Sequence, residues 1–551
     1  MKVWSLPMFE DPNIQTDSIS YAEAVKEITD QVHEMVGNPL SKWAVAATIE
    51  SLGIRDVDAR SDFGYDTVFD LADEVFNRIK DRINQKPAEK LREEEDFEFG
   101  GFFRSLKLFL KYYSQGMVFS LPMLSQIIAI IIFEYALWAW FDFNEAQATV
   151  VALGTIISFI VTGGFIQTLG RLVSRYKGEG NYYLASKATS SVMKLAVPVV
   201  LLAALAIFTL NLILPFYPQQ LMILSMVYMV LISFLLLSAA ILFATEQRTM
   251  ILVGILTGTA VVIFGMDFAE FGIYVSQWLG IITGTVIMTL YAVVYYRIKI
   301  HALRQELFKQ SLPEAEVNYY NTYRYFIYGF CYFTFLFMDR LLAWSAGPPP
   351  PEYIIWFNTP YELGMDWALL TLVITIAMLE YSIHSFSLNL IPVQKSAFIS
   401  KIKSFNSFFR RFYVKQVLLL LFISGVSILV TYFGVLSLRA FEDQVPEISD
   451  FFANPMTFKV FWMASIGYVF LVYGLLNSLF FFTLNRPELV IYAMAGALFV
   501  NFITGFLCSR IFGLEYAVIG LIAGSAVFAI TTGILAKRFF KHLDYFYYSA
   551  F

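Results

Sequence analysis

Four ionisable residues lie inside long apolar segments of this 551-residue sequence. Asp339 and Arg340 are adjacent, while Glu380 and His384 are four positions apart and therefore share one face of a helix. An ionised side chain at the centre of a bilayer costs about 2.5 kcal/mol or more unless it faces water or a partner. We therefore predict that these four residues line a substrate or ion pathway, in which Glu380 and His384 share a proton or bind a sugar hydroxyl.

The same residues also admit a structural interpretation, in which they form ion pairs between neighbouring helices. On that interpretation Asp339 or Glu380 pairs with Arg340 and holds two spans together. His384 considered alone is more typical of a packed histidine than of a ligand. Glu134 is a weaker member of the pathway, because it stands at the end of an apolar run and can reach the membrane interface.

The overall composition is that of a membrane protein. Hydrophobic residues make up 58% of the chain and charged residues 15%, with a mean hydropathy of +0.62, which is too apolar for an ordinary soluble domain. A helix that crosses the bilayer needs about 20 apolar residues. Twelve segments meet that requirement, and they start near residues 117, 146, 190, 219, 249, 272, 323, 366, 412, 457, 488 and 516. The fold class predicted is all-α, with twelve transmembrane helices.

The loops between these segments alternate in charge. Those near residues 171–187, 297–309 and 395–411 are basic, and the intervening loops, including the one that contains Glu362, are acidic. By the positive-inside rule the basic loops and both termini are cytoplasmic, which agrees with an even number of spans. The basic residues Arg171, Arg175 and Lys177 either orient the protein and contact lipid phosphate, or attract an anionic or growing glycan at the cytoplasmic mouth.

Residues 1–100 form a predicted soluble, helical, cytoplasmic domain followed by a charged linker. They contain 22 acidic and 11 basic side chains, whereas the rest of the chain contains 22 and 28. Three helices are expected, because Ser20 begins a capping box, Asn38–Pro39 is typical of a helix start, and Asp66 precedes an apolar run. The charged linker "NQKPAEKLREEEDFEFGG" leads to an interfacial helix near residues 102–113.

A repeated phrase divides the remaining chain into two halves. "IFGMDFAEFG" begins at Ile263 and "IFGLEYAVIG" begins at Ile511, each before the last span of a half. A long basic loop after the second span and a tight polar turn after the fourth, "ATEQRTM" or "TLNRPEL", also recur. We therefore predict six-helix bundles over residues 101–300 and 301–551, related as parallel repeats. Two such bundles can rock about a cavity between them and expose it to one side at a time.

Aromatic residues are dense, with 55 Phe, 32 Tyr and 9 Trp. Sugar rings stack on aromatic faces, so Tyr328, Tyr332, Phe335 and Tyr361 are candidates to line a polysaccharide path. The alternative is that these side chains fill the core or form the aromatic belts at the membrane interfaces.

Several motifs resemble the MATE and polysaccharide-flippase superfamily, and within it the PelG-like exopolysaccharide transporters. They are "GFIQTLGRLVSRYKGEGNYYLASKA", "FMDRLLAW", "TPYELGMDW" and "MLEYSIHSF". The resemblance covers the chain from about residue 99 and implies a MATE-like transporter of a bacterial inner membrane. It also implies export of a hexosamine-rich, Pel-like exopolysaccharide to the outside, within a biofilm polysaccharide complex. The partners implied are a PelF-like cytoplasmic glycosyltransferase and PelD-like and PelE-like membrane proteins.

Other functions stay open at this point. A flippase for lipid-linked oligosaccharide and a cation-coupled drug exporter share the same architecture, and a membrane scaffold for a glycosyltransferase is a further alternative. An enzyme is disfavoured, because the acidic residues of the short soluble domain follow helical faces and form no D-x-D loop. No P-loop, CxxC or metal-ligand spacing occurs, so we expect neither cofactor nor metal, and no nucleic-acid partner.

Overall fold

The computed structural model describes residues 17–37, 39, 41–84, 102–303, 312, 315–347, 353–396, 402–438 and 454–548. Within these residues the fold is all-α, as predicted, and a single antiparallel bridge between Tyr135 and Trp140 is the only strand-like pairing. The predicted charged linker after residue 84 lies outside the described residues.

The N-terminal module contains four helices where the sequence predicted three: α1 (Asp17–Val36), α2 (Lys42–Ser51), α3 (Asp56–Asp62) and α4 (Val68–Asn84). Two predicted helix starts were wrong. Ser20 lies inside α1, and α2 is capped by Ser41, whose hydroxyl accepts a hydrogen bond from the Ala44 amide at 3.4 Å. The apolar faces of the helices bury a separate core that includes Ile28, Ile49 and Leu71.

Eleven described helices are long and apolar enough to cross a membrane, and a bent pair within α6 (Phe102–Phe133) brings the number to twelve. The two parts of α6, residues 106–118 and 120–133, meet at 53°. Pro122 lies just after the bend, where its ring and missing N–H break the helical hydrogen-bond ladder. The chain is therefore a multi-pass membrane protein, and the predicted interfacial helix is the first part of α6.

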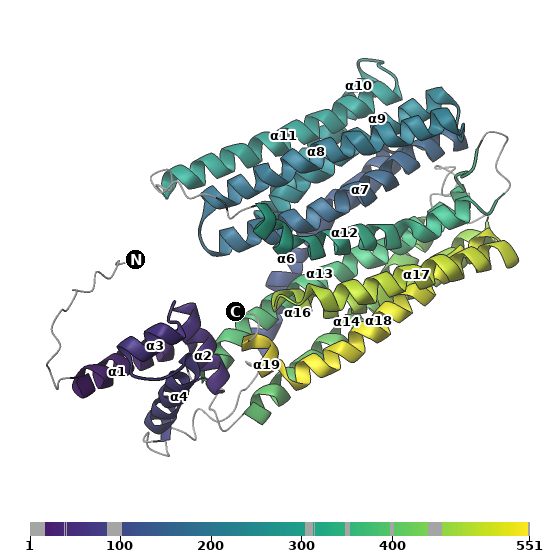
Figure 1. The fold of residues 1–551 in the computed structure, drawn as a ribbon. Coiled ribbons are helices and arrows are strands. Elements are labelled where there is room, and N and C mark those ends of the chain that lie inside the picture. The colour runs from purple at the N-terminus through teal and green to yellow at the C-terminus, as the bar shows by residue number, and fades with distance from the viewer. Residues whose placement is uncertain are drawn as a thin grey trace. The chain divides into compact units, whose positions relative to one another are not determined.

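The other helices of the first half pack side by side in Figure 1. They are α7 (Glu145–Gly178), α8 (Tyr182–Ile213), α9 (Gln219–Ala244), α10 (Arg248–Asp267) and α11 (Ile273–Ala302). The second half contains α12 (Ala315–Trp344), α13 (Thr359–Ser396), α14 (Ile402–Leu438), α16 (Pro455–Thr483), α17 (Pro487–Ile511) and α18 (Val518–Lys541), with a short 3-10 turn, η4 (Leu514–Ala517), before α18. The connections between these helices are short wherever they are described.

The chain forms two compact units. One unit comprises residues 1–106, 384–416 and 537–551, and in it the C-terminal helix α19 (Leu543–Tyr548) contacts α2. The other unit comprises residues 107–383 and 417–536, and it contains most of both six-helix halves.

The turns after α9 and after α16 have the same backbone geometry, so the two halves are built alike at this point. After α9 and after α16 the chain turns through Glu246 (φ 62°) and Asn485 (φ 54°), two of the few non-glycine residues with positive φ. The following amides, Gln247 N and Arg486 N, donate to the carbonyls of Leu242 and Phe481 at 2.8 and 2.9 Å. The polar inner turn that the sequence repeats thus has one backbone geometry in both halves.

The repeated phrase, in contrast, is not in structural register. Matching Ile263 with Ile511 pairs Gly265, inside α10, with Gly513, which lies in the turn at φ 120°. It also pairs Gly272, in the turn at φ 73°, with a glycine inside α18. The structurally equivalent residues are Gly272 and Gly513, because each has positive φ and lies in the turn before the last span of its half, directly before α11 in the first half and before η4 and α18 in the second. Residue-by-residue equivalence through the phrase was therefore wrong, although both copies occupy the corresponding turn.

Close helix contacts give the correct register between the halves. A Cβ on Gly116 of α6 would meet the backbone of Ala377 of α13, and a Cβ on Gly329 of α12 would meet the backbone of Gly163 of α7. Gly116 and Gly329 are 213 positions apart, which sets the equivalence between α6 and α12. These crossings of α6 on α13 and of α12 on α7 join the two halves.

Candidate functional site

A buried charged cluster lies in the second half, between α12 and α13. Arg340 pairs with Glu362 through Nη1 and with Asp366 through Nη2, the latter at 2.9 Å. The Tyr361 hydroxyl donates to Asp339 Oδ2 at 2.9 Å. Asp339 is fully buried, and Glu362 and Arg340 are 4% and 8% exposed. The structure thus joins three predicted site residues, Asp339, Arg340 and Tyr361, with two acidic residues of α13.

The cluster contains more acidic than basic groups. The guanidinium of Arg340 pairs with two carboxylates, those of Glu362 and Asp366, and a third carboxylate, that of Asp339, is buried next to it in the sequence. Asp339 Oδ1 and Glu362 Oε1 are buried and have no hydrogen-bond partner among the described residues. A buried carboxylate is costly unless something neutralises it. The Asp366 side chain is 62% exposed, so the cluster extends from the interior to an accessible surface. Its geometry suits a proton, a cation or a cationic group of a substrate.

The first half has no matching charge at the equivalent position. Gly116 and Gly329 are 213 residues apart, and the same sequence offset leads from Gln126, beyond the bend of α6, to Asp339. Gln126 is also buried, but its amide is satisfied: Nε2 donates to Thr259 Oγ1 at 2.9 Å, and Oε1 accepts from the Leu137 amide at 2.9 Å. The two halves therefore differ chemically at one structural position, with a neutral bridge in the first and an acid in the second.

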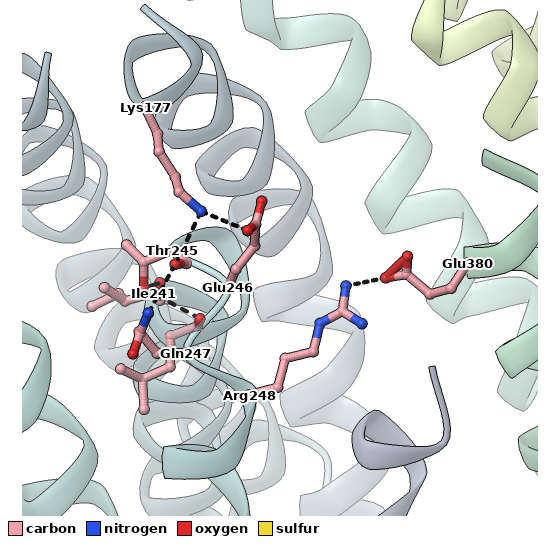
Figure 2. Close-up of polar contacts among 8 residues, drawn as sticks. Lys177, Ile241, Thr245, Glu246, Gln247, Arg248 and Glu380 are labelled. Carbon is pink, nitrogen blue, oxygen red and sulfur yellow. Dashed lines mark hydrogen bonds and ion pairs between the residues drawn. The ribbon is translucent and has the colours of Figure 1, made fainter. Parts of the chain in front are cut away.

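The acidic partners of Arg340 were misplaced by the sequence analysis. Glu362 was assigned to an outer loop, whereas it lies in the first turn of α13 and is buried. Glu380 is not a partner of Arg340, because it pairs instead with Arg248 at the start of α10 (Figure 2). The signal for Glu362 was present in "TPYELGMDW", where it stands four residues before Asp366 on one helical face.

The Arg248–Glu380 ion pair links the two halves at the end of the bundle where the inner turns lie. Its side chains are 17% and 20% exposed, and Arg248 Nη1 also donates to the Gln115 carbonyl at 3.3 Å. Arg248 belongs to the inner turn of the first half, and Glu380 to α13 of the second. The sequence gave no reason to single out Arg248, because one arginine in a polar turn is common.

The three basic residues predicted at the cytoplasmic mouth contact different partners. The Lys177 side chain contacts the turn after α9 in its own half (Figure 2). Its Nζ lies 2.9 Å from Glu246 Oε2 and 3.2 Å from the Thr245 carbonyl oxygen. Arg171 donates to Asn485 Oδ1 at 2.9 Å and so reaches the second half. Arg175 pairs with Glu179 at 3.3 Å in an exposed i,i+4 arrangement.

The remaining predicted residues are distributed over the molecule. His384 is exposed, one helical turn after Glu380 on α13. Glu134 is exposed at the end of α6 with φ 66°. Tyr332 is half-buried and stacks on Tyr328, with their ring centroids 6.0 Å apart. These three predictions stay predictions.

The predicted aromatic path is closed in this structure. Tyr328, Phe335 and Tyr361 are 4%, 0% and 0% exposed, so they pack in the core of the second half. At the outer end the halves also touch, through Tyr217 OH to the Ile355 carbonyl at 2.8 Å and Trp356 Nε1 to Glu145 at 2.6 Å.

Breaking the inner ion pair is expected to impair transport. Glu380→Gln removes one partner of a largely desolvated charge pair, a loss of about 2 kcal/mol or more, and should lower transport about 30-fold or more. Arg248→Glu with Glu380→Arg restores the pair with its sign reversed and should recover part of the rate. Glu270→Gln, at an exposed residue of the outer turn, is the matched control. Wild-type export by Glu380→Gln, at an equal amount of protein in the membrane, would remove the pair from the mechanism.

Comparisons with known proteins agree with the fold. No family model matches the sequence, and no curated protein matches it.

Several solved MATE structures match the fold. A MOP superfamily transporter from Pyrococcus furiosus is 14% identical with a TM-score of 0.54, over 80% of this chain and 96% of that one. A mutant of a MATE transporter is 14% identical with a TM-score of 0.53, over 80% and 97%. A mutant of the Vibrio cholerae MATE transporter VcmN is 15% identical with a TM-score of 0.50, over 79% and 97%. The fold is therefore that of MATE transporters.

Proposed function

We propose that this protein is an inner-membrane transporter that moves a hexosamine-rich exopolysaccharide from the cytoplasm to the outside between its two six-helix halves. The observation that carries the proposal is the acidic surplus of the cluster formed by Asp339, Arg340, Glu362 and Asp366. A hexosamine unit with a free amine carries an ammonium group, and carboxylates bind such groups by charge-assisted hydrogen bonds. The MATE fold supports transport, and the sequence motifs support the class of sugar.

Orientation follows from the loop charges, which favour cytoplasmic termini and a cytoplasmic position for the inner turns. In the structure the halves are linked at the inner turns by Arg248 and Glu380, and at the outer end by Trp356 and Glu145. Alternate release of these two sets of contacts would expose the space between the halves to one side at a time.

A drug exporter is the second candidate, because the same acidic surplus would bind a cationic drug. One structural neighbour is described as a multidrug resistance MATE family transporter, with 13% identity and a TM-score of 0.53. The two candidates differ in the cargo that they accept, and that difference can be measured directly.

An uptake assay with the reconstituted protein distinguishes the polysaccharide transporter from the drug exporter. Proteoliposomes that contain the full chain are offered fluorescent deacetylated chito-oligosaccharide, its fully acetylated counterpart, or ethidium, with a proton gradient, a sodium gradient or neither. We expect uptake of the deacetylated oligosaccharide above that of the acetylated form, and no uptake of ethidium. Uptake of ethidium without oligosaccharide would establish the drug exporter, and liposomes without protein give the background.

We also propose that the N-terminal module docks a cytoplasmic glycosyltransferase, which resemblance identifies as PelF-like, with PelD-like and PelE-like membrane partners. The module has its own core, and it presents Trp43 and Phe69, 63% and 49% exposed, as an edge-to-face pair 5.4 Å apart. Exposed aromatic pairs are typical anchors of protein interfaces.

Substitution of this pair tests the docking proposal. Trp43→Ala with Phe69→Ala should lower co-purification of the glycosyltransferase at least about tenfold, since anchors of this kind contribute about 2 kcal/mol or more each. The amount of transporter in the membrane should not change, because both rings are outside the core. Val57→Ser, at a side chain that is 72% exposed, is the control. Unchanged co-purification in the double variant would place the partner elsewhere.

A further inference from the structure

A small pocket opens at the inner end of the bundle, where the two halves meet. Its volume is about 100 Å³, and its lining includes Arg171, Arg175, Asn321, Arg324, Asn485 and Pro487. These residues come from α7 of the first half, and from α12 and the turn before α17 of the second half. A pocket of this size is smaller than the sites that hold drug-sized ligands, which begin near 300 Å³.

The pocket is rich in arginine. Arg171, Arg175 and Arg324 line it, and Arg486 adjoins it beside Pro487. Among the described residues, the acidic side chains that pair with these arginines include Glu179, 3.3 Å from Arg175, and Glu488, 3.4 Å from Arg324 and 3.6 Å from Arg486. Among these described side chains, four guanidinium groups thus outnumber two carboxylates.

One of these arginines, Arg171, is oriented by neutral groups. Arg171 donates to Asn485 Oδ1 at 2.9 Å and lies over the Tyr325 ring, 5.4 Å from its centroid. Tyr325 OH donates to the same Asn485 oxygen at 3.2 Å. These contacts fix the Arg171 guanidinium without neutralising it, so its charge remains available to a ligand.

The start of α17 adds a second favourable feature. The 25-residue helix begins at Pro487 beside the pocket, and its N-cap residue, Arg486, makes no side-chain capping hydrogen bond. The N-terminal end of a helix has a partial positive charge and free amides that suit an anion. Planar guanidinium groups match the oxygen geometry of phosphate better than point charges do.

We propose that this pocket binds a phosphoryl group, carried either by the headgroup of an anionic lipid or by a soluble phosphate compound. Arg171, Arg175 and Arg324 hold the phosphoryl oxygens, and Asn485 positions Arg171. Because the ligand contacts both halves, its binding stabilises the arrangement in which the inner end is closed. The site is distinct from the acidic cluster, and its excess positive charge would repel a cationic hexosamine. It therefore does not depend on which solute is transported.

Binding to the purified full chain tests the proposal in two arms. In the soluble arm, pyrophosphate is titrated into detergent-solubilised protein by calorimetry. In the lipid arm, native mass spectrometry counts phosphatidylglycerol retained from nanodiscs that contain equal amounts of phosphatidylglycerol and phosphatidylcholine. Arg171→Gln with Arg324→Gln should weaken binding about 100-fold, since each charge-assisted contact contributes about tenfold. Arg297→Gln, at an exposed residue near the end of α11, is the matched control and should bind as the wild type does.

Each outcome of these binding experiments either supports or overturns the proposal. Pyrophosphate binding that the double variant loses identifies a soluble phosphate compound as the ligand, and selective loss of retained phosphatidylglycerol identifies a lipid. Should the double variant not fold, Arg175→Gln, whose side chain is 54% exposed, replaces it with an expected loss of about threefold to tenfold. Equal binding by wild type and variant in both arms, or no binding in either, overturns the proposal.

Discussion

Replacement of Arg340 by glutamine is expected to destabilise the folded protein by about 3–5 kcal/mol, because breaking a buried ion pair leaves an uncompensated charge. Arg340 is 8% exposed and is the partner of both Glu362 and Asp366. Its loss leaves Glu362, 4% exposed, facing the buried Asp339 with no cation beside it. Thermal unfolding followed by size-exclusion chromatography in detergent measures the change.

The double variant Arg340→Gln with Glu362→Gln separates charge from packing. Removal of both partners eliminates the unpaired charge of Glu362 but leaves the carboxylates of Asp339 and Asp366, so the unfolding temperature should recover part of the loss. Arg297→Gln, the same change at an exposed site, should unfold at the wild-type temperature. If Arg340→Gln unfolds there too, the guanidinium does not neutralise the cluster.

Replacement of Asp339 by asparagine should lower transport at least about 30-fold, the equivalent of about 2 kcal/mol or more for the loss of one member of a desolvated charge interaction. The amide has nearly the same shape, and its oxygen can still accept the Tyr361 hydroxyl, so the protein should insert and fold normally. Uptake of deacetylated oligosaccharide into proteoliposomes measures the effect at matched protein density.

Asp142→Asn is the control for Asp339→Asn, because it makes the same change at an exposed outer position. At the same sequence offset the first half has an amide, that of Gln126, and its packing is retained. A loss of transport in Asp339→Asn would therefore report on the charge of the carboxylate. A wild-type transport rate for Asp339→Asn would show that the Asp339 carboxylate has a structural role alone. It would contradict the proposal that Asp339 binds the cargo.

The interior of the second half illustrates what the sequence could and could not predict. Asp339, Arg340 and Tyr361 were recognisable because ionisable and aromatic side chains in apolar segments stand out locally. Glu362 was not recognised, because acidic residues near the end of a span are common in solvent-exposed loops. Only the packing of α13 against α12 distinguishes a buried carboxylate from an exposed one.

By itself the sequence determined the class of protein, the number of spans and the repeated polar turn. These follow from hydropathy, length and turn residues, which act over a few neighbouring positions. Tertiary structure alone decided that Glu380 pairs with Arg248 and that Arg171 reaches Asn485. Such pairings depend on the rotation and crossing of helices more than 100 residues apart, and sequence similarity gave the wrong register even for Gly272 and Gly513.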